Sequence, residues 1–512
     1  MWKFAQGKVP VLQKTSGSFS LPVPTGGINA RDAYTDMDPH DAVGMTNVFP
    51  EANYVAVRAG YNSWATGMTN PVQTLLVWNG LTGLDKIFAA AGSVIYDVNA
   101  SGAATSVVTG LTNAKWQWTN LQNAGGMFLV LCNGANSVRN YNGTTWTTPA
   151  ITGVTSSTLI NVCQFKERLW FAQKDTLDLW YLGLQSISGA ATKYPMGSVF
   201  RRGGYVIAIG SFSNDAGEGP DDYFAIATNN GEVAVYQGTD PTSATTWSLS
   251  GLFDLGKPIG RRCMARMNGD LAIITQDGII SMQAALRFDR SAGQKAAITA
   301  KIQTLFSQYS QQYYTNFGWQ PCVFPKNRYL IVNIPAVSDM VQSQLVMNTV
   351  TGSWCQFTGM AAGCWAVAND KLYFGGNSGV VYQASNGYLD NFGTIPFSLQ
   401  TAWQKVSGDT NKFFTMVRPV MLSGGSAVFG IAANVDFYTV NPSPGTSGPQ
   451  ISGMSWPFTW PGTWGGQNVL DAQWQSVGAI GTWVSINLAG TINGAALQVN
   501  NFELIAQKGG PL

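Results

Sequence analysis

Short apolar strands that turn at glycine or asparagine and return as a second apolar strand recur about seven times along the chain. Each copy has one central apolar residue, and these residues are Phe88, Leu129, Trp170, Phe224, Ile273, Ile331 and Tyr373. Neighbouring central residues lie 41 to 58 positions apart. A hairpin unit that recurs at such a period is typical of β-propeller blades. We therefore expect an all-β fold with a β-propeller of six or seven blades over residues 71–393.

Turn residues inside the copies agree with this expectation. Asn229–Gly231 and Asp277-Gly278 accept the positive φ angles of tight hairpins. Several copies are followed by a turn and a strand that opens on tryptophan, as at Trp146, Trp247 and Trp354. A large aromatic side chain at a fixed place after each hairpin suits the seams between packed blades.

Residues 1–70 are expected to form an extended arm, because several prolines and glycines interrupt regular structure there. Within it, Met37–Asn47 predicts one short helix that begins at Asp38-Pro39, since proline suits the first helical turn. Tyr54, Val55 and Val57, with the Arg58-Ala59-Gly60 end, predict a strand. From its position, we expect this strand to join the last blade and close the ring.

Residues 291–314 depart from the strand pattern, because their apolar residues recur at the spacing of one helix face. We expect a helical insertion near 291–314, between two blades. Its apolar positions include Ile298, Ile302, Leu305 and Tyr309. This helix either packs on its own propeller or supplies an inter-subunit contact through those four residues.

Residues 394–512 contain fewer charges and two stretches of alternating apolar residues, which predict a C-terminal β-sandwich-like domain. A long loop rich in Pro, Gly and Trp lies between these stretches. It carries Trp456, Phe458, Trp460 and Trp464. Four large aromatic residues are difficult to bury inside a thin sandwich. They either pack against the adjoining propeller or form an assembly or gating surface, since Trp is enriched at interfaces.

The composition is that of a turn-rich β protein with aromatic packing. Charged residues make up 11% of the chain, against the usual ~25%. The formal net charge is +2, and the sequence has no long basic run. Strong or sequence-specific binding of nucleic acid needs clustered Lys and Arg. We expect neither, although a neutral polar surface remains compatible with DNA that slides past it.

Side chains for catalysis and metal binding are scarce. His40 is the one histidine, and the sequence has five glutamates. This composition argues against a Ser-His-Asp triad or a histidine-rich metal site. The sequence also contains no GxSxG, GxxxxGK[ST] or HExxH motif. We expect a protein that is not an enzyme and uses no metal and no cofactor.

One acidic segment is the strongest alternative to that expectation. Its polar residues are Asn214, Asp215, Glu218, Asp221 and Asp222. The segment is either a solvated loop between blades, a carboxylate pair of the glycosidase type, or a cation site with oxygen ligands. The Ser-x-Asp-x-Gly-x-x-Trp boxes of sialidase-type propellers are missing, since the nearest match, NGTTWTT, lacks the Ser and Asp.

The remaining candidate groups are two basic pairs and six cysteines. Arg201-Arg202 and Arg261-Arg262 are either solvated loop charges or groups that face an acidic partner or DNA phosphate. The cysteines form no CxxC pair, so we expect free, buried thiols. The N-terminus predicts no secretory signal and the chain no transmembrane helix. We therefore expect synthesis in the cytoplasm and no insertion into a membrane.

A cadence of residues near the start of the chain points to a family. Its members are Asn29, Arg31, Asp32, Asp41, Ala42, Val43, Asn47, Pro50, Arg58 and Gly60. This cadence resembles the opening of tail nozzle proteins of short-tailed bacteriophages, also named tail hub or packaged-DNA stabilisation proteins. Residues 394–419 and the stretch Phe502–Gly510 are similar to that family as well. The Trp-rich loop and the helical insertion are departures from it.

The resemblance implies a structural virion protein that forms a nozzle ring of six copies of the chain. Such a ring would bind a portal-proximal adaptor protein and tail fibre or tail needle proteins. It would retain packaged double-stranded DNA and conduct it during ejection without sequence specificity. The implied location is the virion tail, after assembly in the host cytoplasm. Low, balanced charge and many aromatic residues suit such a permanent assembly.

Two other classes of protein remain as alternatives. A phage or secreted propeller that binds or degrades host polysaccharide is the first. The missing signal peptide and the few glutamates count against it. A cellular scaffold propeller is the second, and a chain so rich in Gly and Trp with so little charge suits that class less well.

Overall fold

The computed structural model describes residues 16–80, 83, 85–215, 220–267, 269–287, 297–335, 342–424, 427–442, 446–447, 469–471 and 473–508. These residues form an all-β, propeller-like fold of many small sheets. Contacts divide the chain into two units. The ring unit comprises Ile28–Arg31 and Arg58–Ile395, and the terminal unit comprises Met1–Gly27, Asp32–Val57 and Pro396–Leu512. The start and the end of the chain therefore build the terminal unit together.

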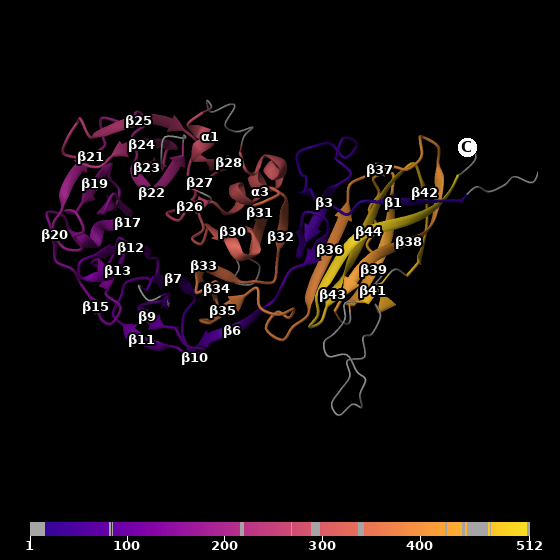
Figure 1. The fold of residues 1–512 in the computed structure, drawn as a ribbon, viewed down its shortest axis with the longest axis horizontal. Helices are drawn as coiled ribbons and strands as arrows, with labels where there is room; N and C mark the ends of the chain where they lie inside the picture. Colours follow the sequence, from indigo (N-terminus) through magenta and orange to yellow (C-terminus); the bar gives the residue numbers. More distant parts are fainter. Residues whose placement is uncertain are drawn as a thin grey trace, which may run out of the picture. The chain divides into compact units, whose positions relative to one another are not determined.

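The ring unit is a succession of small antiparallel sheets (Figure 1). The first contains β7 (Val72–Trp78), β8 (Lys86–Ala91), β9 (Val94–Asp97) and β11 (Thr105–Val108). The second contains β12 (Gln117–Asn123), β13 (Gly126–Cys132), β14 (Arg139–Tyr141) and β15 (Trp146–Thr147). The third contains β17 (Leu159–Phe165), β18 (Arg168–Gln173), β19 (Asp178–Tyr181) and β21 (Thr192–Pro195).

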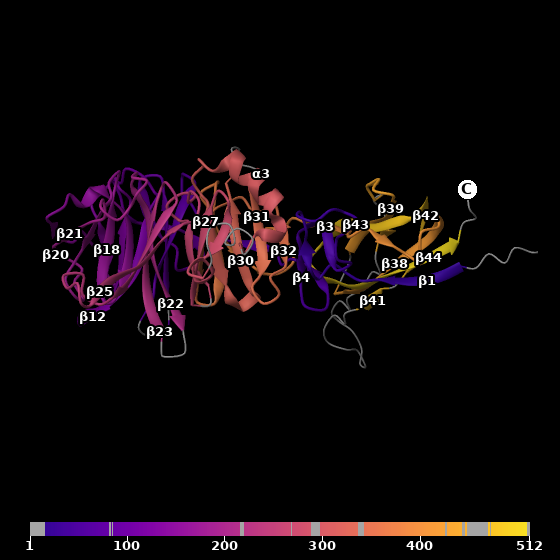
Figure 2. The same cartoon turned by 90° about the horizontal axis from the view of Figure 1, so that it is seen from above.

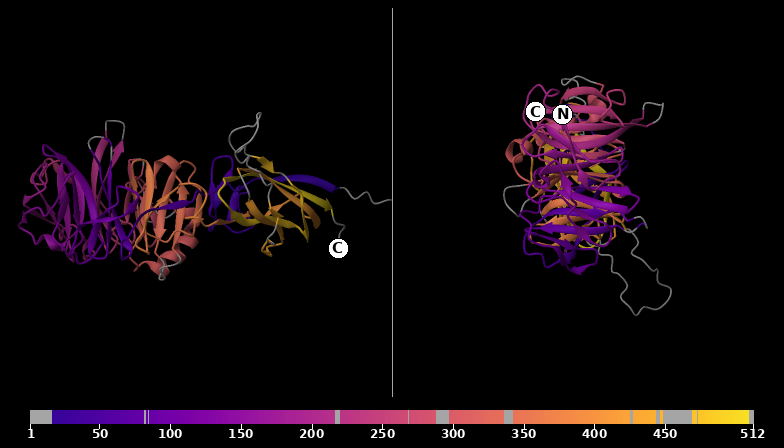
Figure 3. Two further views of the ribbon diagram at one scale, coloured as in Figure 1. Left: turned by 90° about the horizontal axis from the view of Figure 1, so that it is seen from below. Right: turned by 90° about the vertical axis from the view of Figure 1, so that its left-hand side faces the viewer.

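The succession continues through the second half of the unit. The next sheet contains β22 (Val206–Asp215), β23 (Pro220–Thr228), β24 (Glu232–Gly238) and β25 (Trp247–Asp254). It is followed by β26 (Met264–Met267), β27 (Asp270–Thr275) and β28 (Gly278–Ser281), with the short helix α1 (Met282–Ala285). Then come β29 (Gln320–Phe324), β30 (Tyr329–Ile334), β31 (Ser343–Asn348) and β32 (Trp354–Phe357). Seen from the side in Figure 2 and Figure 3, these sheets stand next to one another.

The last sheet of the ring unit joins both ends of that unit. It contains β33 (Ala362–Ala368), β34 (Lys371–Gly376), β35 (Val381–Ala384) and β6 (Tyr61–Thr66). The early strand β6 pairs antiparallel with β35, with Tyr61 opposite Ala384. We expected the closing strand at Val55–Val57, but that strand, β5, pairs with β4 (Val48–Pro50) and β44 (Leu497–Lys508) in the terminal unit. The strand six residues later closes the ring unit instead.

Short elements complete the ring unit. β10 (Gly102–Ala103) pairs parallel with β6, and β16 (Ile151–Thr152) pairs parallel with β20 (Gly189–Ala190). The 3-10 turns are η1 (Ser156–Thr158), η2 (Ala300–Ile302) and η3 (Pro325–Asn327). Gly231, at the β23–β24 turn, has a φ of 93°. This positive angle confirms the hairpin chemistry expected at Asn229–Gly231.

The repeat found in the sequence marks one position in the ring unit. Each of the seven central apolar residues lies on the second strand of its sheet, on β8, β13, β18, β23, β27, β30 and β34. All seven are at most 2% exposed. Each of these strands has a partner strand on both sides within its sheet. The side chains of the central residues pack between neighbouring sheets, as Phe88 and Leu129 do in one cluster.

Tryptophans on fourth strands fill the seams between sheets, as the sequence predicted. Trp146 on β15 packs edge-on against Phe88 of the preceding sheet, with ring centroids 5.0 Å apart. Trp247 on β25 stacks on Trp170 of the preceding sheet at 5.3 Å. Trp354 on β32 is fully buried and donates through Nε1 to the Ile298 carbonyl oxygen at 3.1 Å. The seams at Trp146 and Trp247 therefore combine apolar burial with specific ring geometry.

The helical insertion packs on its own unit. Residues 288–296 lie outside the described residues, and the described helical part consists of η2 and α3 (Gln303–Tyr313). Ile302 and Phe306 are fully buried. Gln303 donates through Nε2 to the Asp277 carbonyl oxygen, and Ser310 donates through Oγ to that of Gln276. α3 therefore rests on the β27–β28 turn.

The four residues proposed for an inter-subunit helix share this environment. Tyr309 accepts a hydrogen bond at Oη from Gln356 Nε2 at 2.8 Å. Ile302 is buried within the unit, whereas Ile298, Leu305 and Tyr309 are half-buried. Ile298 and Ile302 precede α3, so only Leu305 and Tyr309 of the four lie on that helix. Contact with a second subunit through the partly exposed residues stays a prediction.

The terminal unit is built from long antiparallel strands. One set contains β1 (Ser16–Leu21), β4, β5, β38 (Lys412–Ser423), β41 (Val469–Asp471), β42 (Gln475–Gly481) and β44. The other contains β3 (Asp41–Thr46), β36 (Ile395–Thr401), β37 (Gln404–Lys405), β39 (Ala427–Val435), β40 (Thr446–Ser447) and β43 (Trp483–Ile492). β2 (Gly27–Ile28) lies where the chain passes between units. Burial alternates along β38 and β44, so each has one apolar face.

The start of the chain differs from the extended arm expected for residues 1–70. Its described residues supply β1, β3, β4 and β5 to the terminal unit and β6 to the ring unit. The helix expected over Met37–Asn47 is wrong, because the structure has strand β3 there. Thr46 pairs with Ser398 on β36. A partner strand more than three hundred residues away outweighs the local helix signal from Asp38-Pro39.

We predict that Gly60→Ala destabilises the ring unit by about 1–3 kcal/mol, because extra atoms in a packed site force neighbouring groups apart. A Cβ at Gly60 would lie 2.0 Å from the Leu389 carbonyl oxygen. Gly197→Ala is the matched control, since a Cβ there meets nothing within 4 Å. Thermal unfolding of both variants tests this, and equal melting temperatures would contradict it.

Candidate functional site

Two adjoining cavities lie among the first strands of the sheets in the ring unit. The larger chamber has a volume of about 590 Å³ and is lined from β12, β17, β22 and β26. The smaller chamber has a volume of about 210 Å³ and is lined from the opposite ends of the same strands, with Gln320 and Pro321 of β29. Trp118, Val162 and Ile209 line both chambers, as does Met264. These four large, mainly apolar side chains therefore form the wall that the two chambers share.

Three arginines from one stretch of chain line these chambers. Arg266 lines the larger chamber and donates through Nε to the Ser211 carbonyl oxygen at 2.7 Å. Arg261 and Arg262 line the smaller one. The lining of either chamber, as far as the described residues define it, includes no carboxylate. The centre of the ring unit is therefore positive, although the whole chain carries a formal charge of only +2.

Arg262 is held by backbone rather than by an acidic partner. It donates through Nη1 to the Gln73 carbonyl oxygen at 2.8 Å and through Nη2 to that of Trp116 at 3.2 Å. Its guanidinium carbon lies 4.7 Å from the centroid of the Phe317 ring. Burial lowers the pKa of Arg262 to about 10. This pKa still lies well above neutrality, so the side chain keeps its positive charge.

Lys166 pairs with the carboxylate that lies nearest to these arginines in the described part of the acidic segment. Asp222 accepts hydrogen bonds from Lys166 Nζ and Ser213 Oγ, both at 2.7 Å. Partial burial alone would raise the pKa of Asp222, but these two hydrogen bonds outweigh it and lower that pKa. Asp222 is therefore an ion-pair partner. The side chains of Asn214, Asp215, Glu218 and Asp221 lie outside the described residues.

The other basic pair and the histidine have local partners. Arg202 forms an ion pair with Asp254, and the backbone N–H groups of Arg201 and Arg202 donate to the Glu232 carboxylate. His40 is exposed, with Nδ1 3.1 Å from the Asp38 carboxylate. Within the described ranges, no group of three or more His, Cys, Asp or Glu residues is arranged to hold a metal ion.

All six cysteines are free, and all but Cys163, which is half-buried, are buried, so the expectation of unpaired buried thiols is confirmed for five of them. Burial raises the pKa of the Cys263 thiol to about 12 and that of Cys364 to about 11. Burial also raises the pKa of Cys163, which lines the larger chamber. Thiols with raised pKa values stay protonated at neutral pH, and a protonated thiol is a poor nucleophile.

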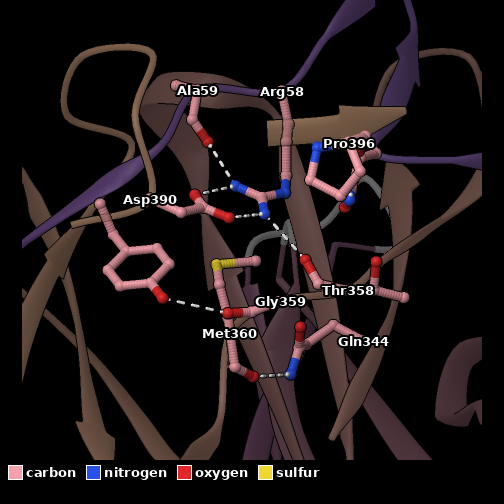
Figure 4. A network of polar contacts seen from close by, with 10 residues as sticks. Arg58, Ala59, Gln344, Thr358, Gly359, Met360, Asp390 and Pro396 are labelled. Atoms are coloured by element: carbon pink, nitrogen blue, oxygen red, sulfur yellow. Dashed lines mark hydrogen bonds and ion pairs between the residues drawn. The ribbon is translucent and has the colours of Figure 1, made fainter. Parts of the chain in front are cut away.

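A second polar site holds the start of the ring unit to its end (Figure 4). Arg58 donates through Nη1 and Nη2 to the two carboxylate oxygens of Asp390, at 2.8 and 2.6 Å. It also donates to the carbonyl oxygens of Ala59 and Thr358. The two side chains are 1% and 10% exposed, respectively. A two-pronged pair with extra hydrogen bonds is the geometry that offsets the cost of burying charge.

The chain around Thr358 is fixed by further contacts shown in Figure 4. Gln344 donates through Nε2 to the Met360 carbonyl oxygen at 3.1 Å. Tyr61 donates through its hydroxyl to the Gly359 carbonyl oxygen, also at 3.1 Å. Burial and the negative charge of Asp390 raise the pKa of Tyr61 to about 12, so this hydroxyl keeps its proton. The Arg58 site therefore couples three segments that are distant in sequence.

Asn47 has the same kind of role within the terminal unit. It is fully buried with a φ of 57°, a conformation that Asn accepts more readily than most residues. Its side chain donates through Nδ2 to the Pro396 carbonyl oxygen at 2.8 Å. Asn47, Arg58 and Gly60 all belong to the cadence noted in the sequence. The structure shows that each fixes an early segment to a late one.

Four aromatic residues of the C-terminal loop were proposed as an assembly or gating surface. Trp456, Phe458, Trp460 and Trp464 lie outside the described residues.

The sequence did not reveal the two chambers, although the pair Arg261-Arg262 was noted in it. The signal available was that pair of adjacent arginines directly before a predicted blade. None of the helices in the described ranges is long and apolar enough to span a membrane.

We predict that Arg58→Met destabilises the ring unit by about 3–5 kcal/mol, because it leaves the Asp390 carboxylate buried without its partner. Arg202→Met is the matched control: its ion pair with Asp254 is largely exposed and should contribute about 0–1 kcal/mol. Chemical denaturation of both variants measures the difference. The double variant Arg58→Met/Asp390→Leu should recover part of the loss, and equal effects of the two single variants would contradict the assignment.

Comparison with known proteins gives the following. No protein-family model and no curated protein matches the chain. Among solved structures, a streptogramin B lyase is 12% identical over 62% of this chain and 96% of its own, with a TM-score of 0.36. A chain of BBS1N in complex with ARL6DN is 10% identical over 64% and 99%, with a TM-score of 0.39. These neighbours are β-propeller-like folds, and likeness at this level indicates nothing about function.

Proposed function

We propose that the chain is a structural virion protein, the subunit of a tail nozzle ring in a short-tailed bacteriophage. The ring retains packaged double-stranded DNA and conducts it during ejection. The observation that carries this proposal is the role of the N-terminal cadence. Its residues Asn47, Arg58 and Gly60 fix early segments of the chain to late ones. A signature of such residues supports a family related by architecture rather than by a catalytic site.

The finer architecture is part of the proposal. The ring unit is a propeller of seven blades, with β6 as the outer strand of the last blade. The terminal unit is a β-sandwich in which β1 pairs along its whole length with the second half of β44. A strand contributed by the opposite end of each unit resists opening by force, because its removal breaks a row of backbone hydrogen bonds. This property suits a protein that holds DNA under pressure.

The DNA path lies between subunits rather than through the propeller. The larger chamber, at about 590 Å³, has the volume of a small-molecule site. A duplex is too large for a cavity of this volume. A conduit therefore requires several copies around a shared axis. A head-to-tail interface that closes on itself produces such a ring.

The partners follow from the same position in the particle. One face of the ring of six subunits binds the portal-proximal adaptor protein, and the other binds tail fibre or tail needle proteins. The protein reaches the virion tail after assembly in the host cytoplasm, and it acts without enzymatic turnover. The loop with Trp456 and Trp460 provides the apolar surface for assembly or gating.

We predict six-fold rings when the purified full chain is imaged by electron microscopy, alone or with virion extracts. The ring should lie at the tail tip in intact particles, where antibodies against the chain would label it. A monomer at high protein concentration that is absent from virions would overturn the proposal. Release of reducing sugar from host polysaccharide by the purified chain would favour the polysaccharide-degrading alternative instead.

We predict that deletion of Met454–Gly465 leaves a folded subunit with near-native thermal stability but impairs tail assembly or DNA retention. The reason is that burying each large aromatic side chain is worth about 1.5–3 kcal/mol, and a partner surface can supply that burial. Thermal unfolding and the fraction of DNA-filled particles are the two measurements. Unfolding of the isolated variant would assign these aromatic residues to the core of the subunit.

A further inference from the structure

The smaller chamber of the ring unit combines positive charge with enclosure. Its wall includes Arg261, Arg262, Gln117, Asn161 and Thr74. Its volume is about 210 Å³. A space of this size holds a group of a few heavy atoms rather than a nucleotide or an oligosaccharide, since drug-sized ligands occupy about 300–1,000 Å³. Small size and cationic walls together define what can enter.

The positive charge of this chamber lacks compensation in the described residues. Neither Arg261 nor Arg262 takes part in an ion pair found there. Charges withdrawn from water without a counter-charge are costly. An anion in the chamber would remove that cost.

Several hydrogen-bond donors of the chamber wall remain available. Arg261 makes one side-chain hydrogen bond, a long one from Nη1 to the Asn133 carbonyl oxygen at 3.4 Å. Gln117 lines the chamber, and its buried Nε2 amide has no hydrogen-bond partner among the described residues. Buried amide donors are nearly always paired in folded proteins. The unused donors and the uncompensated charge therefore point to the same kind of ligand.

We propose that the smaller chamber binds one small oxyanion, a phosphate or carboxylate group, between Arg261, Arg262 and the side-chain amide of Gln117. The planar guanidinium groups match the oxygen atoms of either group, and hydrogen bonds to a charged acceptor are about twice as strong as neutral ones. Arg262 is already fixed by backbone carbonyl oxygens. Arg261 and Gln117 supply the contacts that the ligand completes.

The bound oxyanion links three sheets of the ring unit. Gln117 begins β12, Arg261 and Arg262 precede β26, and the carbonyl groups that hold Arg262 belong to β7 and to the residue before β12. Ligand binding should therefore raise the melting temperature of the ring unit, because a ligand that binds only the folded state stabilises it. This inference does not depend on the proposed role in a virion.

Isothermal titration calorimetry on the full chain tests the proposal, in chloride buffer of low ionic strength. Inorganic phosphate and malonate are titrated separately. We expect saturable binding of at least one of them below about 10 mM, together with a higher melting temperature. Binding of phosphate alone would identify a phosphate-bearing ligand, and binding of malonate alone would identify a carboxylic acid.

Three variants localise the effect. Arg261→Gln should weaken binding at least about ten-fold, and Gln117→Leu should weaken it several-fold without any change of charge. Arg202→Gln is the matched control, since Arg202 pairs with Asp254 and is not among the residues that line the chamber. It should bind like the parent. Absence of saturable binding of both anions, or parent-like binding by both Arg261→Gln and Gln117→Leu, would overturn the proposal.

Discussion

Closure is the constraint on which the ring unit depends, and the buried pair between Arg58 and Asp390 is the interaction that secures it. A succession of packed sheets leaves the apolar faces of its first and last members uncovered unless the two ends of the unit meet, and here Val72 of the first sheet packs in one cluster with Tyr373 of the last. Here β6 supplies the outer strand of the last sheet, and the pair lies beside it with side chains that are 1% and 10% exposed. Burying two charges is favourable only because Ala59 and Thr358 accept the remaining hydrogen bonds. The same junction leaves no room for a side chain at Gly60.

The parts of the fold that the sequence predicted are those with a local cause. The central apolar residues of the repeat, such as Phe88 and Tyr373, lie on equivalent strands because a hairpin is encoded within about a dozen residues. The seam tryptophans follow the same rule. The helix predicted for Met37–Asn47 and the partner predicted for the strand at Val55–Val57 were wrong. Both segments contribute a strand that has a neighbour from the far end of the chain. Long-range pairing leaves little trace in a short window of sequence.

The two chambers were also predictable from the sequence only in part. Adjacent arginines at Arg261-Arg262 were visible in the sequence, but the chambers were not, since their walls come from the first strands of several sheets. The absence of a long basic run did not reveal that positive charge gathers at the centre of the ring unit. A whole-chain charge of +2 averages over this centre and over outer pairs such as Arg202 with Asp254. Charge distribution depends on topology as much as on composition.

The pairing of β1 with β44 has a consequence for how the protein is made. Ser20 and Asn501, which hydrogen-bond across this pair, are 481 positions apart. During translation the ring unit is synthesised before β44, the partner of β1, so the terminal unit can form only after β44 has been made. A prematurely terminated chain would carry a finished ring unit and an open sheet edge. Formation of the terminal unit thus requires synthesis through β44, which supplies the partner of β1.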